Sequence, residues 1–356
     1  MAEMARVTLE PTGEQFSVGE DEDILTAALH NGINLQYGCR HGNCSSCKHW
    51  LLDGDVDDSA GSVYAIPRNE REDGAILLCC AFAKSDLVIE IHQHEGVEAL
   101  PPMTPPSPRR ATVLGQRSRT PNLVELRVEL DEPLSFRAGQ YAEFTLDTGD
   151  RRSYSLVNPP SSGRELTFCV KRVQSGVFSG VLDRIGPGSH LHLEAPFGTM
   201  FLRETGRPVI AVGIGSGIAP LLSILTDAAD QQVDVPIRFY YGARTTGDLV
   251  YLDELAELSR RLRDFQFIPC LSQGSPDTLP RNGRAGRVTR AVAEDIRDAS
   301  LYDAYLCGAP EMCDAVGRLL EAKGLPEARI HADKFYAATE SDPVQVSEHR
   351  PNWARR

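Results

Sequence analysis

The sequence has no long apolar run and no start typical of secretion. Residues 209–225, its longest stretch without charge, contain glycines and Pro220, so we interpret them as a strand, a turn and a helix. The N-terminus lacks the basic segment and apolar run of a signal peptide. We therefore expect a cytoplasmic protein with no membrane association.

An excess of basic residues is also missing. The formal net charge is −13, which argues against nucleic acid as a partner. Residues 1–98 hold 18 acidic and 6 basic side chains, whereas the remainder holds 32 and 31. The acidity therefore belongs to an N-terminal domain. A length of 356 residues, with 41% hydrophobic and 24% charged residues, indicates two or three ordinary globular domains.

Cysteine is present in one informative pattern. Cys39, Cys44 and Cys47 stand in the spacing C-x4-C-x2-C, and residues 77–80 read LLCC. With a distant fourth thiolate, this is the ligand spacing of a plant-type [2Fe-2S] cluster. A zinc site using Cys44 and Cys47 is the alternative, but adjacent cysteines are a poor second pair. Disulfides suit small secreted domains and do not suit this chain.

The elements around these cysteines predict a β-grasp-like unit. Residues 5–10 and 15–18 alternate as a hairpin, a short helix follows a cap at Asp21 or Asp23, and strands are expected at 48–52 and 87–92. Residues 1–98 thus resemble a plant-type ferredoxin domain. The resemblance implies that Cys79 is the fourth ligand. Strand alternation, which sends Cys79 and Cys80 to opposite faces, favours the same choice.

Residues 99–110 contain five prolines in twelve positions. We expect such a segment to form neither helix nor sheet and to act as a semi-stiff linker over residues 99–109. The linker would let the ferredoxin domain move between the group that loads it and the partner that unloads it.

Residues 110–203 read as short strands with glycine and proline turns, which predicts a small antiparallel barrel. The sequence RSYS at residues 152–155 and GVFS at 176–179 resemble the flavin motifs of the ferredoxin-NADP reductase superfamily. An exposed strand and an ordinary helix cap are the alternative for either motif alone. The resemblance implies that Arg152 pairs with the flavin diphosphate, Tyr154 lies along the isoalloxazine and Ser155 bonds near N5. Gly176, Val177 and Ser179 would open a helix that holds the pyrophosphate, which favours FAD over FMN.

Residues 204–336 alternate strands and helices, as in a parallel α/β sheet. A buried strand leads into a glycine turn and a helix, the arrangement that receives a dinucleotide pyrophosphate. The turn contains Gly213, Gly215, Gly217 and Pro220. Arg244 is the one cation near the end of the second strand and is followed by the anionic Asp248, so NADH is the expected donor and NADPH is less favoured.

Two further residues follow from the resemblance. Cys307, in the sequence CGAPEM, is placed near the nicotinamide C4, although a buried core thiol is the ordinary alternative. Phe335 falls where the superfamily has a C-terminal aromatic near the flavin. Residues 337–356 show no periodicity and are expected to form an irregular tail.

The fold class is therefore multi-domain: a β-grasp ferredoxin, an FAD barrel and a nucleotide-binding domain. A nicotinamide gives two electrons and a cluster takes one, so the flavin must mediate between them. No further redox centre is apparent. This order of modules resembles the reductase component of soluble di-iron multicomponent monooxygenases acting on alkanes, alkenes or phenol. The resemblance implies a hydroxylase partner, and we expect a monomer.

Three alternatives stay open. Reductases of ring-hydroxylating dioxygenases and of deoxysugar pathways share the layout, and a non-catalytic [2Fe-2S] redox sensor is a different class. The complete flavin and nicotinamide motifs argue against the sensor. A sodium-pumping membrane relative would be expected to carry an N-terminal anchor.

Overall fold

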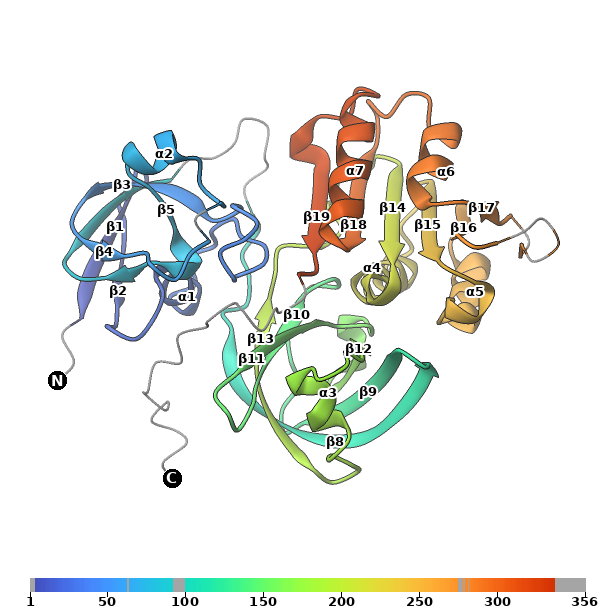
Figure 1. Cartoon of the computed structure of the whole chain (residues 1–356), viewed down its shortest axis with the longest axis horizontal. Helices are drawn as coiled ribbons and strands as arrows, with labels where there is room; N and C mark the ends of the chain where they lie inside the picture. The colour runs from blue at the N-terminus through green and yellow to red at the C-terminus, as the bar shows by residue number, and fades with distance from the viewer. Residues whose placement is uncertain are drawn as a thin grey trace. The chain divides into compact units, whose positions relative to one another are not determined.

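A computed structural model describes residues 4–62, 64–91, 100–274, 277, 279–280 and 282–336 (Figure 1). The described chain divides into two compact units. The first contains the N-terminal residues through Ser107 and the loop Asp147–Asp150, and the second contains Pro108–Leu146 and Arg151–Tyr336.

The first unit is built on one mixed sheet with the strand order β2-β1-β7-β3-β5. Strand β1 pairs antiparallel with β2 and parallel with β7, and a second small sheet joins β4 to β6. The elements are β1 (Ala5–Glu10), β2 (Glu14–Val18), α1 (Ile24–His30), β3 (Lys48–Asp53), β4 (Val56–Asp57), α2 (Arg68–Glu72), β5 (Ala75–Leu77), β6 (Phe82–Ala83) and β7 (Leu87–Glu90).

Local chemistry explains helix α1. The Asp23 side chain accepts the Thr26 N–H at 2.9 Å, so Asp23 is the N-cap, and Asn31 is the C-cap before Gly32 at φ +75°. Every residue of α1 before His30 is buried. The predicted hairpin and helix are confirmed. The strand expected at residues 87–92 is present as β7, Leu87–Glu90, and residue 92 lies outside the described residues.

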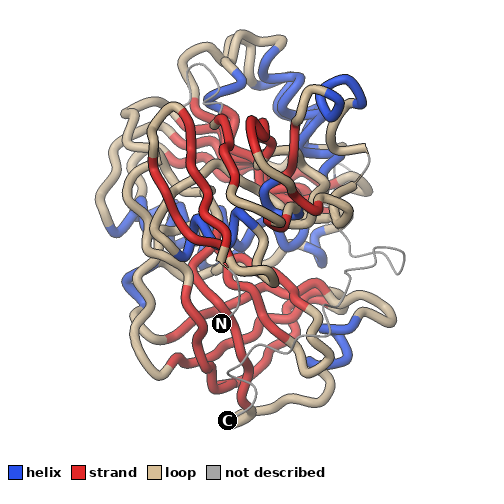
Figure 2. Tube along the Cα trace, turned by 90° about the vertical axis from the view of Figure 1, so that its left-hand side faces the viewer, coloured by secondary structure: helices blue, strands red, loops and turns tan. Residues whose placement is uncertain are grey.

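The second unit begins with an antiparallel barrel whose strand order is β11-β10-β13-β8-β9-β12. A bridge between Leu156 and Phe168 joins its two edges, so the sheet curls around an apolar core. Strands predominate here, and α3 is the one α-helix among the described barrel residues (Figure 2). The elements are β8 (Ser107–Thr120), β9 (Leu123–Leu130), β10 (Tyr141–Thr145), β11 (Arg151–Ser155), β12 (Glu165–Lys171), α3 (Val177–Leu182) and β13 (His190–Phe197).

Strand β8 corrects one expectation about the proline-rich segment. We expected residues 99–110 to stay out of any sheet, but β8 begins at Ser107 and pairs with β9 from Ala111. Pro108 is tolerated because it lies near the start of the strand, where no ladder bond from its nitrogen is needed.

The rest of the second unit is a parallel sheet with the order β17-β16-β15-β14-β18-β19. Alternate residues of β14 face opposite layers. Val209 and Ala211 pack with α4 and α5, whereas Ile210 and Val212 pack with α6 and α7. The elements are β14 (Val209–Ile214), α4 (Ile218–Asp230), β15 (Ile237–Ala243), α5 (Leu252–Arg261), β16 (Phe265–Leu271), β17 (Arg284–Ala285), α6 (Val288–Asp295), β18 (Asp303–Gly308), α7 (Pro310–Glu321) and β19 (Ile330–Lys334).

Barrel and sheet share part of one core. Leu123, Cys169 and Met200 of the barrel side belong to the same apolar cluster as α4 and α5. The fully buried Ser223 of α4 accepts the Gly139 N–H at 3.3 Å and donates to the Asn158 carbonyl at 2.8 Å. These contacts make the barrel and the parallel sheet one unit.

Candidate functional site

The loop between α1 and β3 brings three of the predicted thiols together. Arg40, Gly42 and Ser45 all have positive φ, which turns the backbone N–H groups toward sulfur. The Cys39 N–H donates to Cys44 Sγ at 3.2 Å, and the His41 N–H donates to Cys39 Sγ at 3.4 Å. Such N–H donors stabilise thiolates and the sulfur ligands of a metal centre.

The thiols form two pairs. Cys39 is hydrogen-bonded to Cys44, and Cys47 to Cys79. In each pair the accepting sulfur, of Cys44 or Cys79, has a lowered pKa because its partner donates to it. The donating thiols of Cys39 and Cys47 have raised pKa values for the same reason, together with burial.

The arrangement of the thiols in two pairs indicates which metal centre they fit. Within the described part of the chain, no three His, Cys, Asp or Glu side chains converge closely enough to hold one metal ion. Two pairs of thiolates instead suit two irons, so the residues present fit a [2Fe-2S] cluster.

The fourth-ligand argument from strand alternation was wrong. Strand β5 ends at Leu77, and Leu78–Cys80 form a 3-10 helix, η1. In that helix neighbouring side chains are not on opposite faces, and the sulfurs of Cys79 and Cys80 lie 3.6 Å apart. Cys79 contacts Cys47 and accepts the Gly42 N–H, which supports its assignment over Cys80. A Cβ on Gly42 would lie 2.8 Å from Cys80 Sγ, so this close approach requires glycine.

Sequence reasoning missed a partly buried polar group beside the cluster loop. Arg40 Nη2 donates to Thr26 Oγ1 at 2.8 Å, and that hydroxyl donates to Asp23 Oδ2 at 2.7 Å. Burial raises the pKa of Asp23 to about 6, although Arg40 opposes the shift. Arg40 also helps lower the pKa of Cys79. The signal was present in the sequence, as a basic residue directly after the first cysteine and the cap pattern Asp-x-x-Thr.

The two predicted flavin motifs lie side by side in the barrel. Tyr154 of β11 packs on Phe178 of α3, with ring centroids 4.6 Å apart. Burial raises the pKa of the Tyr154 hydroxyl. Arg152 is half-buried, and Ser155, at the end of β11, is buried.

Gly176 is the N-cap of α3 and carries no side-chain cap, which leaves the first N–H groups of the helix to other acceptors. Val177 is 40% exposed beside them. Ser179 Oγ turns back to accept the Val173 N–H at 2.9 Å, so it braces the preceding turn. The backbone at the start of α3, rather than the Ser179 hydroxyl, suits an anionic group.

The glycine turn after β14 lies against the end of β18. A Cβ on Gly217 would be 2.1 Å from the Cys307 carbonyl oxygen, so only glycine fits there. Gly215 has φ +55°, and its carbonyl accepts the Tyr241 hydroxyl at 3.1 Å. Gly213 ends the buried part of β14. Pro220 lies in the first turn of α4, where proline is tolerated.

The remaining predicted residues differ in accessibility. Cys307 is fully buried, and burial raises the pKa of its thiol. Phe335 is half-buried, and its N–H donates to the Gly308 carbonyl at 2.8 Å. Arg244 follows β15 and lies 3.8 Å from Asp248, whose carboxylate also accepts the Thr245 N–H and hydroxyl. The one cation expected near a 2′-phosphate is therefore already paired.

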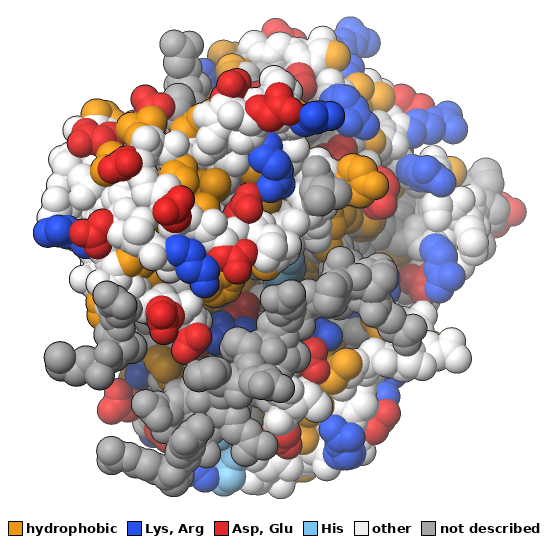
Figure 3. All heavy atoms as spheres, turned by 60° about the vertical axis from the view of Figure 1, so that its left-hand side comes forward, with side chains coloured by type: hydrophobic (Ala, Val, Ile, Leu, Met, Phe, Trp, Pro, Cys, Tyr) orange, Lys and Arg blue, Asp and Glu red, His pale blue; other side chains and the backbone are white. Residues whose placement is uncertain are grey.

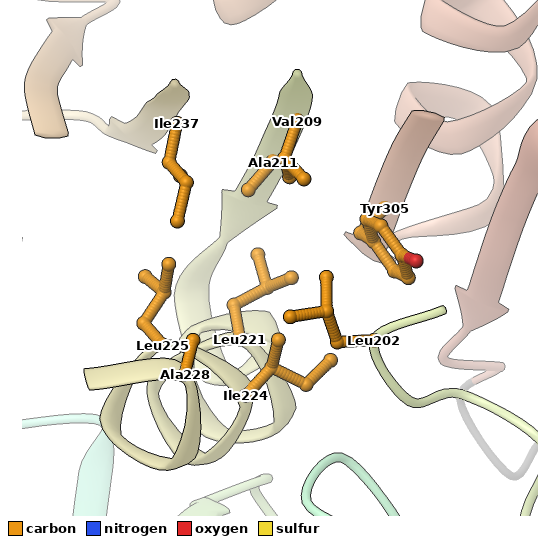
Figure 4. Close-up of a pocket in the computed structure, with 9 residues that line it drawn as sticks. All are labelled: Leu202, Val209, Ala211, Leu221, Ile224, Leu225, Ala228, Ile237 and Tyr305. Carbon is orange, nitrogen blue, oxygen red and sulfur yellow. The ribbon is translucent and has the colours of Figure 1, made fainter. Parts of the chain in front are cut away.

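An apolar pocket lies beneath α4 and is not part of this site (Figure 4). Its side chains point toward one another from α4, β14, β15, β18 and the connector before β14. They are Leu202, Val209, Ala211, Leu221, Ile224, Leu225, Ala228, Ile237 and Tyr305. The Tyr305 hydroxyl accepts the Arg203 N–H at 2.8 Å. With no charged lining residue, this pocket belongs to the core and does not suit a nucleotide.

Comparison with known proteins agrees with this geometry. Residues 7–84 match the 2Fe-2S iron-sulfur cluster binding domain, residues 111–202 the oxidoreductase FAD-binding domain and residues 211–318 the oxidoreductase NAD-binding domain. The chain is 38% identical to the reductase component of propane 2-monooxygenase from Mycolicibacterium goodii, over 94% of this chain and 98% of that protein. The chain belongs to the family of monooxygenase reductase components.

Other relatives support this family. The reductase component of phenol 2-monooxygenase from Pseudomonas sp. (strain CF600) is 33% identical, over 94% of this chain and 95% of that protein. The crystal structure of the Amycolatopsis cytochrome P450 reductase GcoB has a TM-score of 0.84 at 28% identity, covering 94% of this chain and all of that one.

Membership confirms the predicted fold class, the oxidoreductase activity and the cofactors. This reductase binds NADH, FAD and a [2Fe-2S] cluster and passes electrons in that order toward a hydroxylase. Among the described residues, no helix has both the length and the hydropathy needed to cross a membrane.

Proposed function

We propose that this reductase serves the hydroxylase of a soluble di-iron monooxygenase acting on an alkane, alkene or phenol, and that it works as a cytoplasmic monomer. The observation that carries the proposal is the match along nearly the full length of a propane 2-monooxygenase reductase component. The chain would comprise a ferredoxin domain (1–98), a linker (99–109), a flavin domain (110–203), a nucleotide domain (204–336) and a tail (337–356).

Different residues would bind the flavin, the nicotinamide dinucleotide and the cluster. The flavin, when bound, accepts electrons in pairs and releases them singly. Arg152 and the N–H groups at the start of α3 would neutralise its diphosphate, while Tyr154 and Ser155 orient its ring. The glycine turn would receive the pyrophosphate of NADH, with Cys307 and Phe335 near the nicotinamide and the flavin. Cys39, Cys44, Cys47 and Cys79 would hold the two irons, and Arg40 would place a positive charge beside them.

Activity assays with purified hydroxylases test which partner this reductase serves. The full chain, loaded with both cofactors, should support NADH-dependent product formation by a propane or phenol hydroxylase and give little turnover with a ring-hydroxylating dioxygenase or a deoxysugar dehydrase. The opposite ranking would overturn the proposed partner class. Size-exclusion chromatography with light scattering tests the monomer.

The choice of NADH over NADPH can be tested at Asp248. Asp248 pairs with Arg244, and its carboxylate accepts the N–H of Thr245. The negative charge of Asp248 should therefore repel a 2′-phosphate and keep Arg244 from binding it. We expect kcat/KM to be higher for NADH than for NADPH. Asp248→Asn should lower the ratio of these two kcat/KM values about tenfold, which corresponds to about 1.4 kcal/mol. Asp234→Asn, at an exposed ion pair with Arg263, is the control. A tenfold preference of the native protein for NADPH would contradict the assignment.

A further inference from the structure

Arg119 links the flavin barrel to the nucleotide module. Its Nε and Nη2 donate to Glu125 Oε2 on β9 at 2.9 and 2.5 Å, and Nη2 also donates to Glu254 Oε1 on α5 at 3.0 Å. The Arg119 side chain is 17% exposed and that of Glu125 is 9% exposed. Removing one member of such a buried group leaves an uncompensated charge, so its geometry is strongly favoured once formed.

Tyr251, which packs against Arg119, has an unusual backbone conformation. The Arg119 guanidinium lies 4.3 Å from the centre of the Tyr251 ring, and the buried Tyr251 side chain belongs to the same apolar cluster as Cys169 of β12. Tyr251 directly precedes α5 and has φ +59° and ψ +31°. A large side chain rarely adopts this left-handed conformation, so the contacts from the barrel must hold it there.

The candidate nucleotide loop, residues 244–248, lies just before the residue that is held in this way. Residues 244–248 close the end of β15, and Asp248 is three residues before Tyr251. Tyr241, inside the same apolar cluster, supports the glycine turn through its bond to the Gly215 carbonyl. Barrel side chains therefore contact Tyr251 and Glu254, which follow residues 244–248, and they share an apolar cluster with Tyr241 of β15.

We propose that Arg119 is a positioning residue for hydride transfer, because it fixes residues 244–251 against the flavin barrel and so sets where bound NADH presents its nicotinamide. The inference rests on the transfer from NADH to FAD described above, in which NADH becomes NAD⁺ and the flavin accepts the hydride with its two electrons. Arg119 itself exchanges no proton or electron. Its role is to hold two modules in register.

The test measures flavin bleaching by NADH in anaerobic stopped flow, using the full chain with both cofactors. Arg119→Met should lower the limiting rate constant about tenfold, because a small misplacement of the reacting carbon is costly. The apparent Kd for NADH, the FAD content and the bleaching amplitude should change little. A general loss of folded protein would lower the amplitude and leave the rate constant of the remaining molecules unchanged. The control is Arg127→Met, which breaks an exposed pair with Glu165 on the same barrel.

Tyr251 variants separate the ring contact from the backbone strain. Tyr251→Phe keeps the ring under the guanidinium and should bleach at nearly the native rate. Tyr251→Gly relieves the left-handed strain but removes the ring, and it should resemble Arg119→Met. Native rates in Tyr251→Gly would overturn the role of the stack.

If Arg119→Met fails to retain FAD, Glu254→Gln tests the same proposal. Glu254 is 38% exposed and contributes only the ion pair that crosses between the modules, so this variant should fold. Its limiting rate constant should fall about threefold, less than in Arg119→Met, because a partly exposed ion pair contributes only a small stabilisation. A native rate constant in Glu254→Gln, or in a flavin-loaded Arg119→Met protein, would overturn the proposal. Failure of the native protein itself to oxidise NADH would instead refute the proposed function.

Discussion

The candidate cluster ligands come from one loop and one short turn, whereas the flavin and nucleotide residues come from β11, α3, β14, β15 and β18. In the N-terminal unit the spacing of three cysteines already places their sulfurs on one concave loop. In the second unit each motif means little until strands distant in sequence pair, as when Tyr154 meets Phe178. A local site therefore depends on a few covalent positions, and a distributed site depends on how its modules are held together.

The most severe test of the local site is removal of a ligand. Cys79→Ser is expected to lose most of the iron-sulfur absorbance and the corresponding electron paramagnetic resonance signal, because its sulfur contacts Cys47 and accepts the Gly42 N–H. Cys80→Ser should keep both signals. The measurement is iron and acid-labile sulfide per chain, together with the two spectra.

The 3.6 Å between the two sulfurs makes a third variant informative. If Cys79→Ser retains a weakened cluster that disappears in Cys79→Ser/Cys80→Ser, the neighbouring thiol can substitute as a ligand. If Cys80→Ser loses the cluster and Cys79→Ser keeps it, the ligand assignment is wrong.

Separating the units is the next test of the comparison. Residues 1–98 expressed alone should bind the cluster, and residues 108–356 should bind FAD and reduce ferricyanide with NADH. The second fragment should lose nearly all electron transfer to cytochrome c that requires the cluster. Because β8 and the shared core of barrel and sheet lie within residues 108–336, we expect this fragment to keep its flavin. Loss of flavin from it would contradict the modular interpretation.

The sequence predicts the local features of this molecule better than those that depend on tertiary packing. The hairpin, a helix cap at Asp21 or Asp23, the alternation of strands and helices over residues 204–336 and the glycine turn followed from periodicity and local chemistry. The 3-10 helix at Leu78–Cys80 did not, because apolar residues before a cysteine fit a strand equally well. The contact of Arg119 with Tyr251 could not be predicted, since it joins residues 132 positions apart through tertiary packing alone. The sequence leaves Cys307 open between a core thiol and a site residue, and its full burial is visible only in the structure.

Acid should destabilise the second unit through His331. Burial, with Arg203 nearby, lowers the pKa of His331 to about 4, and its ring packs on Tyr305 at 4.9 Å. The unfolded chain binds a proton below about pH 6.5, whereas the folded chain does so only near pH 4, so stability falls as pH decreases through this window. His331→Phe should remove about 2 kcal/mol of that loss at pH 5.

Urea unfolding of the 108–356 fragment at several pH values measures this effect. His190→Gln, at an exposed position on β13, is the control and should keep the native pH dependence. A His331→Phe protein whose stability still falls with the native slope between pH 6.5 and 5 would show that other groups dominate.

The smallest expected effect concerns charge, which also separates the units. Residues 1–98 carry a formal charge of −12, and acidic side chains are spread over the face that Figure 3 brings forward. Long-range attraction should speed docking on a basic hydroxylase surface. Electron transfer to the hydroxylase should slow several-fold from about 0.01 M to about 0.15 M salt, as screening shortens to roughly 8 Å. Flavin reduction by NADH should change little.

Charge reversal shows which unit is responsible. Asp55, Asp57 and Asp58 are adjacent candidates, but Asp58 pairs with Arg71 at 2.7 Å and Asp57 accepts the Ser59 hydroxyl, so reversing them would disturb the fold. A set drawn from exposed positions is cleaner: Asp53→Lys, Asp55→Lys and Asp73→Lys together. The matched control is the exposed set Asp131→Lys, Glu204→Lys and Asp264→Lys in the second unit.

The first set should flatten the salt dependence of transfer to the hydroxylase while the cluster spectrum stays native, and the control set should leave that dependence in place. Equal effects of both sets would mean that net charge, rather than the N-terminal unit, guides the encounter. If native transfer rates do not respond to salt, apolar contact must govern docking. Leu52 and Tyr64, 56% and 94% exposed, are then the residues to replace, because Tyr37 is only 5% exposed and cannot reach a partner without unfolding the loop.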